Sequence, residues 1–171
     1  MERGDRYAIW PICKTDDGWS VPDELLIKLW QQMVDEGRAA RLFYTGTVTN
    51  GGEWVEWLKD SRNLPIMVMD SREMKIACVA WLNNVDRGCA QIHFCMLGPP
   101  ATGIGINALE YYSRFPDLHV IVGVTPEEYT TAIRYAKRIG FKEVGVIPNM
   151  LQMKYENRRM GAVITYYEVG R

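Results

Sequence analysis

The sequence has few of the residues from which metal sites and disulfide frameworks are built. Its 171 residues include only four cysteines and two histidines. No two cysteines form a Cys-x-x-Cys pair, so a zinc site would need scattered ligands, and we expect no metal. Cys78, Cys89 and Cys95 fall in apolar segments, where a free thiol acts as a small hydrophobic side chain. This cysteine usage favours a reducing compartment and predicts a cytoplasmic location.

Long apolar runs and an excess of charge are also missing. No 18 apolar residues follow one another, and the charged segment 1–6 does not lead into the apolar core of a signal peptide. A membrane-spanning protein is therefore not expected. The net charge is −1, which makes nucleic acid an unlikely partner, although a local basic stripe lies between Arg134 and Lys142. A solvated helix face explains that stripe more simply.

The remaining composition is that of one ordinary globular domain. Hydrophobic residues make up 47% of the chain, and no repeat or linker divides it. We predict a single domain over residues 1–171, with a variable helical part over residues 1–64 and a more regular core over residues 65–169.

Periodicity in the N-terminal part predicts two helices. The first spans about Pro22 to Glu36, with Ser20 as its expected N-cap and Gly37 as its terminator. A weaker pattern covers Trp54 to Leu58, after a turn-like segment at residues 50–52 that we interpret as a connection. Tryptophans are frequent in this part, and they suit either a core or an aromatic lining for a substrate.

Residues 65–97 predict an antiparallel meander of three strands, over residues 66–69, 74–82 and 89–97, with a hairpin turn at residues 83–88. Helices and strands then alternate: a helix over residues 103–115, a strand over 119–124, a helix over 126–139 and a strand over 142–147. Thr125 and Glu128 stand three residues apart and predict a capping box for the helix at Pro126. Two further apolar runs cover residues 150–155 and 162–169. We therefore predict an α/β (α+β) fold with a mixed, mostly antiparallel central sheet of about six to seven strands flanked by helices.

Two segments of this core resemble a known family. The apolar strand Ala90–Leu97 runs into a glycine-containing loop, Gly98–Gly105, and then into a helix. Downstream, Ala132–Gly145 resembles the Ala-(x)6-Leu-Gly-Phe-x-x-x-Gly signature of the GNAT (GCN5-related N-acetyltransferase) superfamily. The separation of the two segments also fits that family. The resemblance extends over about residues 65–169 and implies a GNAT-like fold that binds acetyl-CoA.

The resemblance also implies where acetyl-CoA is held. Glycine lets a backbone approach a ligand closely, and a helix N-terminus offers N–H groups to a pyrophosphate. In the family, the pantetheine arm lies along the strand that precedes this loop. The residues expected to bind acetyl-CoA are therefore Cys95, Met96, Leu97, Gly98, Thr102, Gly103, Ile104, Gly105 and Tyr129.

The sequence departs from the family at three functional positions. Pro100 replaces the Gln or Arg that opens the phosphate-binding signature, and it donates no N–H. Ala136 stands where the family often has a tyrosine that protonates the departing thiolate. Tyr135 is its neighbour, but one residue along a helix turns a side chain by about 100°. Tyr129 replaces an asparagine that is common at the start of that helix.

Three residues are the candidates for catalysis. His93 lies on the predicted central strand, where it suits a general base or a hydrogen-bonded core histidine. Tyr135 is the candidate acid. Glu53, with its neighbour Glu56, falls where an acceptor loop is expected in this fold, although surface carboxylates are the simpler interpretation.

Two functions from different classes follow from these observations. The first is an acetyl-CoA-dependent N-acetyltransferase that transfers acetyl directly to an amine, on a small molecule or a protein. The alternative is a GNAT-fold protein with weakened catalysis that serves as a binding or assembly module, because Pro100, Ala136 and Tyr129 occupy functional positions. Irregular motifs of this kind suggest a phage or prophage type. The aromatic Tyr166 and Tyr167 near the C-terminus suit a homodimer as well as a core strand.

Overall fold

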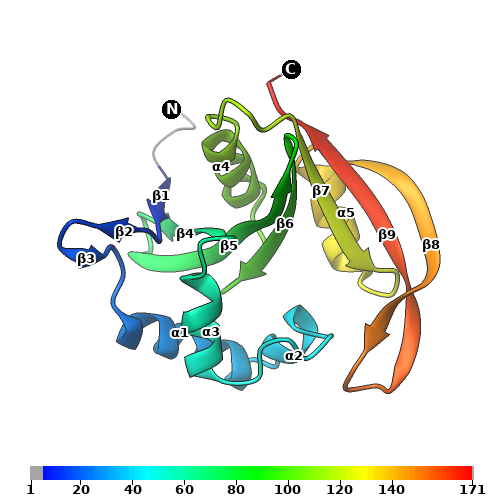
Figure 1. The fold of residues 1–171 in the computed structure, drawn as a ribbon, viewed down its shortest axis with the longest axis horizontal. Helices are drawn as coiled ribbons and strands as arrows, with labels where there is room; N and C mark the ends of the chain where they lie inside the picture. Colours follow the sequence, from blue (N-terminus) through cyan, green and yellow to red (C-terminus); the bar gives the residue numbers. More distant parts are fainter. Residues whose placement is uncertain (1–5, 171) are drawn as a thin grey trace.

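A computed structural model describes residues 6–170, so the first five residues of the charged N-terminal segment lie outside the described range. Its main feature is a seven-stranded sheet in the order β1-β4-β5-β6-β7-β9-β8 (Figure 1). The β6–β7 pair is parallel and the other neighbours are antiparallel. The predicted fold class is confirmed. The strands of this sheet are β1 (Tyr7–Pro11), β4 (Leu64–Asp70), β5 (Lys75–Asp86), β6 (Cys89–Met96), β7 (Val120–Pro126), β8 (Lys142–Met153) and β9 (Arg158–Glu168).

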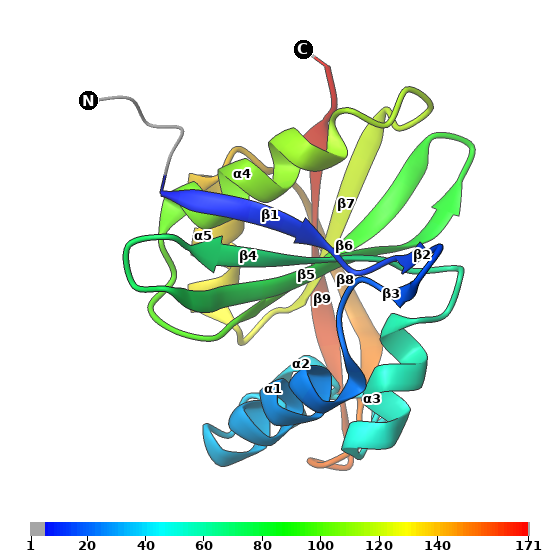
Figure 2. The same ribbon diagram turned by 90° about the vertical axis from the view of Figure 1, so that its left-hand side faces the viewer.

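Helices cover both faces of the sheet (Figure 2). On one face lie α1 (Asp23–Asp35), α2 (Ala39–Leu42) and α3 (Gly51–Leu58), and on the other lie α4 (Thr102–Tyr112) and α5 (Thr130–Arg138). Neighbouring residues of a strand point to opposite faces, so β6 contributes Cys95 to the first core and Ile92 to the second. A small hairpin of β2 (Lys14–Thr15) and β3 (Gly18–Trp19) follows β1. Among residues 6–170, none of the helices combines the length and apolar character needed to cross a bilayer.

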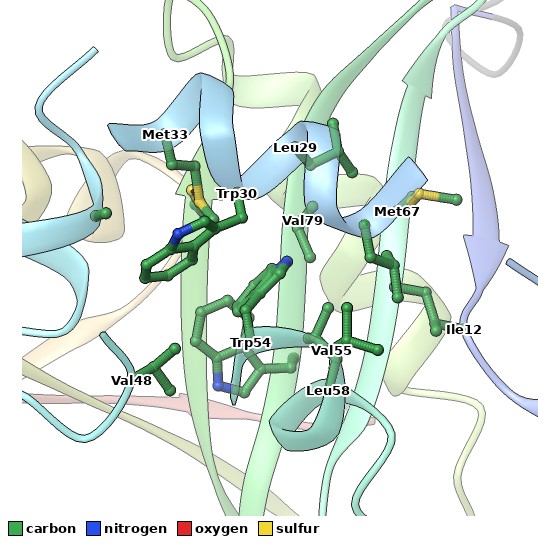
Figure 3. Close-up of a cluster of buried hydrophobic side chains, with 14 of the residues drawn as sticks. Ile12, Leu29, Trp30, Met33, Val48, Trp54, Val55, Leu58, Met67 and Val79 are labelled. Carbon is green, nitrogen blue, oxygen red and sulfur yellow. Dashed lines mark hydrogen bonds between the residues drawn. The ribbon is translucent and has the colours of Figure 1, made fainter. Parts of the chain in front are cut away.

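The core under α1 and α3 is a cluster of buried hydrophobic side chains that includes several aromatic rings (Figure 3). Trp54 and Trp81 are buried with ring centroids 5.7 Å apart, and Phe43 stacks on Trp81 at 6.0 Å. Trp30 contacts both Phe43 and Trp54. Of the two interpretations of these tryptophans, the structure therefore supports the core. This cluster packs α1 and α3 against β5 and β6.

The N-terminal helices begin differently from the sequence expectation. Pro22 is the residue before α1, and no side chain caps that helix. Ser20 instead accepts from the Cys13 N–H and donates to the Pro11 carbonyl, because the hairpin places it beside the end of β1. Asn50 was expected in a connection, but its side chain accepts from the Glu53 N–H and caps α3.

The predicted helix at Pro126 was wrong in its first turn. Val124, Thr125 and Pro126 pair with β9, so β7 continues through Pro126 and α5 begins at Thr130. The capping box does not form, because α5 begins only after Glu128, whose carboxylate pairs with Arg158. The long-range pairing with β9 thus overrides the local helix signal. In the same way, residues 142–153 form one irregular strand, β8, instead of two.

Candidate active site

The candidate site is a cleft between β6 and β7. Their parallel pairing covers only Cys89–Gln91 against Val120–Val122, although β6 continues to Met96 and β7 to Pro126. Beyond Gln91 the two strands separate, and the space between them forms a cavity of about 710 Å³. Its walls come from β6, β7, α5 and the α2 segment. This volume lies within the range of small-molecule sites.

The separation of the strands exposes backbone groups of β6 to the cleft. The Leu97 N–H donates to the Ala77 carbonyl of β5 at 2.9 Å, so the backbone groups of Leu97 point toward β5. Because alternate residues of an antiparallel strand point their backbone groups to opposite sides, those of Phe94 and Met96 face away from β5. Arg38 Nη1 donates to the Met96 carbonyl at 2.8 Å. One edge of β6 is therefore directed at the cavity.

The glycine loop joins this edge to α4. Gly98 has open space where a Cβ would lie, and no side chain caps the N-terminus of α4. Gly103 and Gly105 have a different environment: a Cβ at Gly103 would lie 2.8 Å from the Tyr7 ring, and one at Gly105 would lie 2.7 Å from the Tyr135 hydroxyl. A side chain at either position would have to displace these groups, so packing inside the protein favours glycine there.

His93 lies in the wall of the cleft. Its ring stacks on Trp81 with centroids 5.1 Å apart and planes 11° from parallel. Nε2 lies 3.2 Å from Asn83 Oδ1. Burial lowers the pKa of His93 to about 4, because a charged imidazole is poorly solvated there. The ring is therefore neutral at pH 7.

Tyr135 and Ala136 both line the cleft, but the tyrosine hydroxyl is turned toward the glycine loop. It donates to the Ala101 carbonyl at 3.1 Å, and the ring packs edge-on against Phe94 at 6.1 Å. Burial raises the pKa of Tyr135 above its usual range. The hydroxyl thus holds the loop against α5.

Glu53 is not among the residues that line the cleft. Its carboxylate accepts from the Thr49 N–H at 2.7 Å and from the Thr49 hydroxyl at 2.9 Å, and these bonds lower its pKa. The structure gives it a role in forming the first turn of α3. Of the residues expected to bind acetyl-CoA, Cys95, Met96 and Tyr129 line the cleft. The other six do not line it, and of these Leu97 and Ile104 are buried in the two cores: Leu97, Gly98, Thr102, Gly103, Ile104 and Gly105.

One end of the cleft, which we call its outer end, is formed by four residues that were not predicted as site residues: Arg41, Tyr44, Glu128 and Glu156. Arg41 and Tyr44 come from the α2 segment, and the rings of Tyr44 and Tyr129 meet edge-to-face at 6.4 Å. Glu128 and Glu156 come from the β7–α5 and β8–β9 connections. Burial raises the pKa of Tyr129, and the charge of Glu156 adds to that effect. Because these residues are distant in sequence and match no motif, no local signal identified them.

We compared the sequence and the structure with those of known proteins. No protein-family model and no curated protein matches the sequence. Among solved structures, spermidine N-acetyltransferase from Vibrio cholerae in complex with CoA and spermine has a TM-score of 0.73 at 13% identity, covering 97% of each chain. Ribosomal-protein-S5-alanine acetyltransferase from Vibrio fischeri has a TM-score of 0.71 at 11% identity, covering 97% of this chain and 94% of that one.

A third structure is a dodecameric spermidine N-acetyltransferase from Vibrio cholerae, with a TM-score of 0.68 at 13% identity over 96% of this chain and 95% of that one. Identities this low establish shared architecture and leave the acceptor open. The strand order, the separated β6 and β7 and these structural neighbours together show that the chain has the GNAT acetyltransferase fold, in a divergent form.

Proposed function

We propose that this protein is an acetyl-CoA-dependent N-acetyltransferase that transfers the acetyl group directly to an amine. The observation that carries the proposal is the edge of β6 that faces a cavity of about 710 Å³ where β7 departs. An extended ligand can bind to such an edge as an additional strand would. Solved structures with this fold include N-acetyltransferases, and one of them contains bound CoA.

The residues of the cleft fit a long, polar cosubstrate. The backbone groups of Phe94 and Met96 would hold the pantetheine arm, and the loop that begins at Gly98 would hold the pyrophosphate with the uncapped N-terminus of α4. Pro100 lines the cleft and offers no N–H, so α4 supplies the donors at this end. Bound acetyl-CoA supplies an activated thioester.

The side chains of the cleft have limited capacity for acid–base chemistry. His93 is neutral at pH 7, so it can accept a proton, but a pKa of about 4 makes it a weak base. The hydroxyl of Tyr135 must leave the Ala101 carbonyl before it can protonate a thiolate. We infer that catalysis relies mainly on holding the amine beside the thioester and on a backbone N–H of β6 as oxyanion donor.

Titration of the protein with acetyl-CoA by calorimetry tests the cosubstrate site. A Cβ at Gly98 would meet no atom within 4 Å, so Gly98→Glu is chosen to add a carboxylate to the loop, with Gly98→Gln as the matched neutral control. We expect the glutamate variant to bind acetyl-CoA about tenfold more weakly than the glutamine variant, because like charges near the pyrophosphate repel. A well-folded wild type that does not bind millimolar acetyl-CoA would refute the proposal.

Turnover separates the two functions that the sequence left open. Release of CoA thiol in the presence of an amine panel supports the enzyme, whereas tight uptake of acetyl-CoA without transfer to any amine favours the binding or assembly module. Ala136, which lines the cleft at the usual position of the acid, is the feature that favours the second outcome. A phage or prophage origin, a cytoplasmic location, assembly as a homodimer and roles for His93, Tyr135 and Glu53 in catalysis stay predictions.

A further inference from the structure

Charges of both signs surround the outer end of the cleft. Arg41, Glu128 and Glu156 line the main cavity, and Arg41 and Glu156 also line an adjoining cavity of about 90 Å³. The charges of Glu156, Arg41, Glu128 and Arg158 all act on the Tyr129 hydroxyl. Two of these groups are cationic and two are anionic, so a polycation gains no net attraction from them.

The two carboxylates of this group are already paired. Arg158 Nη1 and Nη2 each donate to a different oxygen of Glu128 at 2.7 Å. Its Nη2 and Nε atoms each lie 2.6 Å from Glu156 Oε2. One guanidinium therefore bridges both acids, and a cationic acceptor would have to compete with Arg158 for either of them.

Arg41 is in the opposite situation. Its side chain is exposed, it lines both cavities, and it makes no ion pair within the range that the structure describes, residues 6–170. The neighbouring Arg38 is engaged by Glu36 and by the Met96 carbonyl. A guanidinium offers several N–H donors in one plane, and it matches a carboxylate or a phosphate. Arg41 is thus the cation of the cleft that is available to a ligand.

We propose that the acceptor is an amine that also carries an anionic group, a carboxylate or a phosphate, and that Arg41 binds this group. The inference rests on the proposed acetyltransferase function and names the substrate class of the same cleft. The rings of Tyr44 and Tyr129 stand beside Arg41 and form the wall along which the acceptor reaches β6. Polyamines, which carry positive charge only, are disfavoured by the same arrangement.

The test compares acceptors that carry the anion with neutral analogues of the same skeleton. Each α-amino acid is assayed against its carboxamide, 2-aminoethyl phosphate against ethanolamine, and spermidine serves as the polycation, with CoA thiol release as the readout. We expect wild-type kcat/KM to favour the better anionic series over its neutral analogue by about tenfold or more, the effect of one charge-assisted hydrogen bond. Arg41→Gln should abolish that preference, and Arg41→Lys should restore part of it.

Arg114→Gln is the matched control, because Arg114 is exposed near the end of α4 and does not line the cleft. It should keep the wild-type preference. The proposal is overturned if wild type does not distinguish acids from amides, if spermidine is the best acceptor, or if Arg41→Gln keeps the preference. Failure of the proposed function is recognised separately, because calorimetry measures acetyl-CoA binding without an acceptor.

If no amine is acetylated, the same ligand pairs are tested for binding by saturation-transfer NMR in the presence of CoA. A carboxylate or phosphate preference that disappears in Arg41→Gln supports the anion site without turnover. Equal binding of acids and amides overturns it.

Discussion

Replacing His93 should change how the stability of the protein depends on pH. His93 is packed on Trp81, and its pKa falls from 6.5 to about 4 in the folded state because burial opposes the charged ring. Above pH 6.5 the imidazole is neutral in both the folded and the unfolded chain, so its titration contributes nothing. As the pH falls from 6.5 toward 4, the unfolded chain binds a proton and the folded chain does not. The folded state therefore loses stability in that window.

The size of the effect follows from the pKa difference. A fall of 2.5, from 6.5 to about 4, corresponds to about 3 kcal/mol at 1.36 kcal/mol per pKa unit. In His93→Gln the titrating group is absent. The free energy of unfolding of wild type, relative to this variant, should thus drop by about 3 kcal/mol between pH 7 and pH 4. His93→Gln also loses the stacking on Trp81, but this loss is the same at every pH and therefore cancels when the pH dependence of the two proteins is compared.

Urea denaturation of both proteins at half-unit steps from pH 4 to pH 7.5 measures the difference. His119→Gln, the same exchange at the other histidine, is analysed in parallel, so that the two histidines are separated. Parallel stability curves for wild type and His93→Gln would show that the imidazole titrates alike in the folded and unfolded chains, and would refute the reasoning. If His93 also acts in catalysis, the acid limb of kcat/KM should have its midpoint near pH 4.

Three further substitutions test individual contacts. Tyr135→Phe removes the hydrogen bond to the Ala101 carbonyl. We therefore expect thermal melting to show a stability about 1 kcal/mol lower, with only a small change in kcat. A hundredfold fall in kcat at an unchanged Tm would instead make Tyr135 the general acid. Arg38→Gln should lower the urea midpoint by the equivalent of about 1 kcal/mol, because the clamp on the Met96 carbonyl is lost, and an unchanged midpoint would count against that clamp. Asn50→Ala should cost about 1 kcal/mol through loss of the α3 cap, whereas Asn50→Asp should keep most of it; equal values for the two variants contradict the capping role.

Much of the fold was predictable because its signals are local. The meander of β4, β5 and β6 follows from apolar runs separated by turn residues, and the end of α5 follows from Gly140, whose φ of +108° suits glycine. The strand, glycine loop and helix at residues 90–112 also stand consecutively in the chain, so their order could be recognised. The strand and loop on which the proposed cosubstrate site rests were therefore visible in the sequence, whereas the residues that bind acetyl-CoA stay a prediction.

The tertiary structure decided what depends on distant partners. Pro126 has a strong local signal for a helix, yet pairing with Ala162 places it in a strand. The cleft exists because β6 and β7 stop pairing after Gln91 and Val122, which no spacing along the chain reveals.

The same is true of the acceptor end. Arg41 comes from α2, and Glu128 and Glu156 come from two separate connections; they meet only because the fold places these three segments at one end of the cleft. The sequence by itself determined the core and the loop before α4, since these rest on local periodicity and turn chemistry. Which charges are paired and which one faces the cavity was decided by long-range packing alone, because a charge acquires its partner only when the chain has folded.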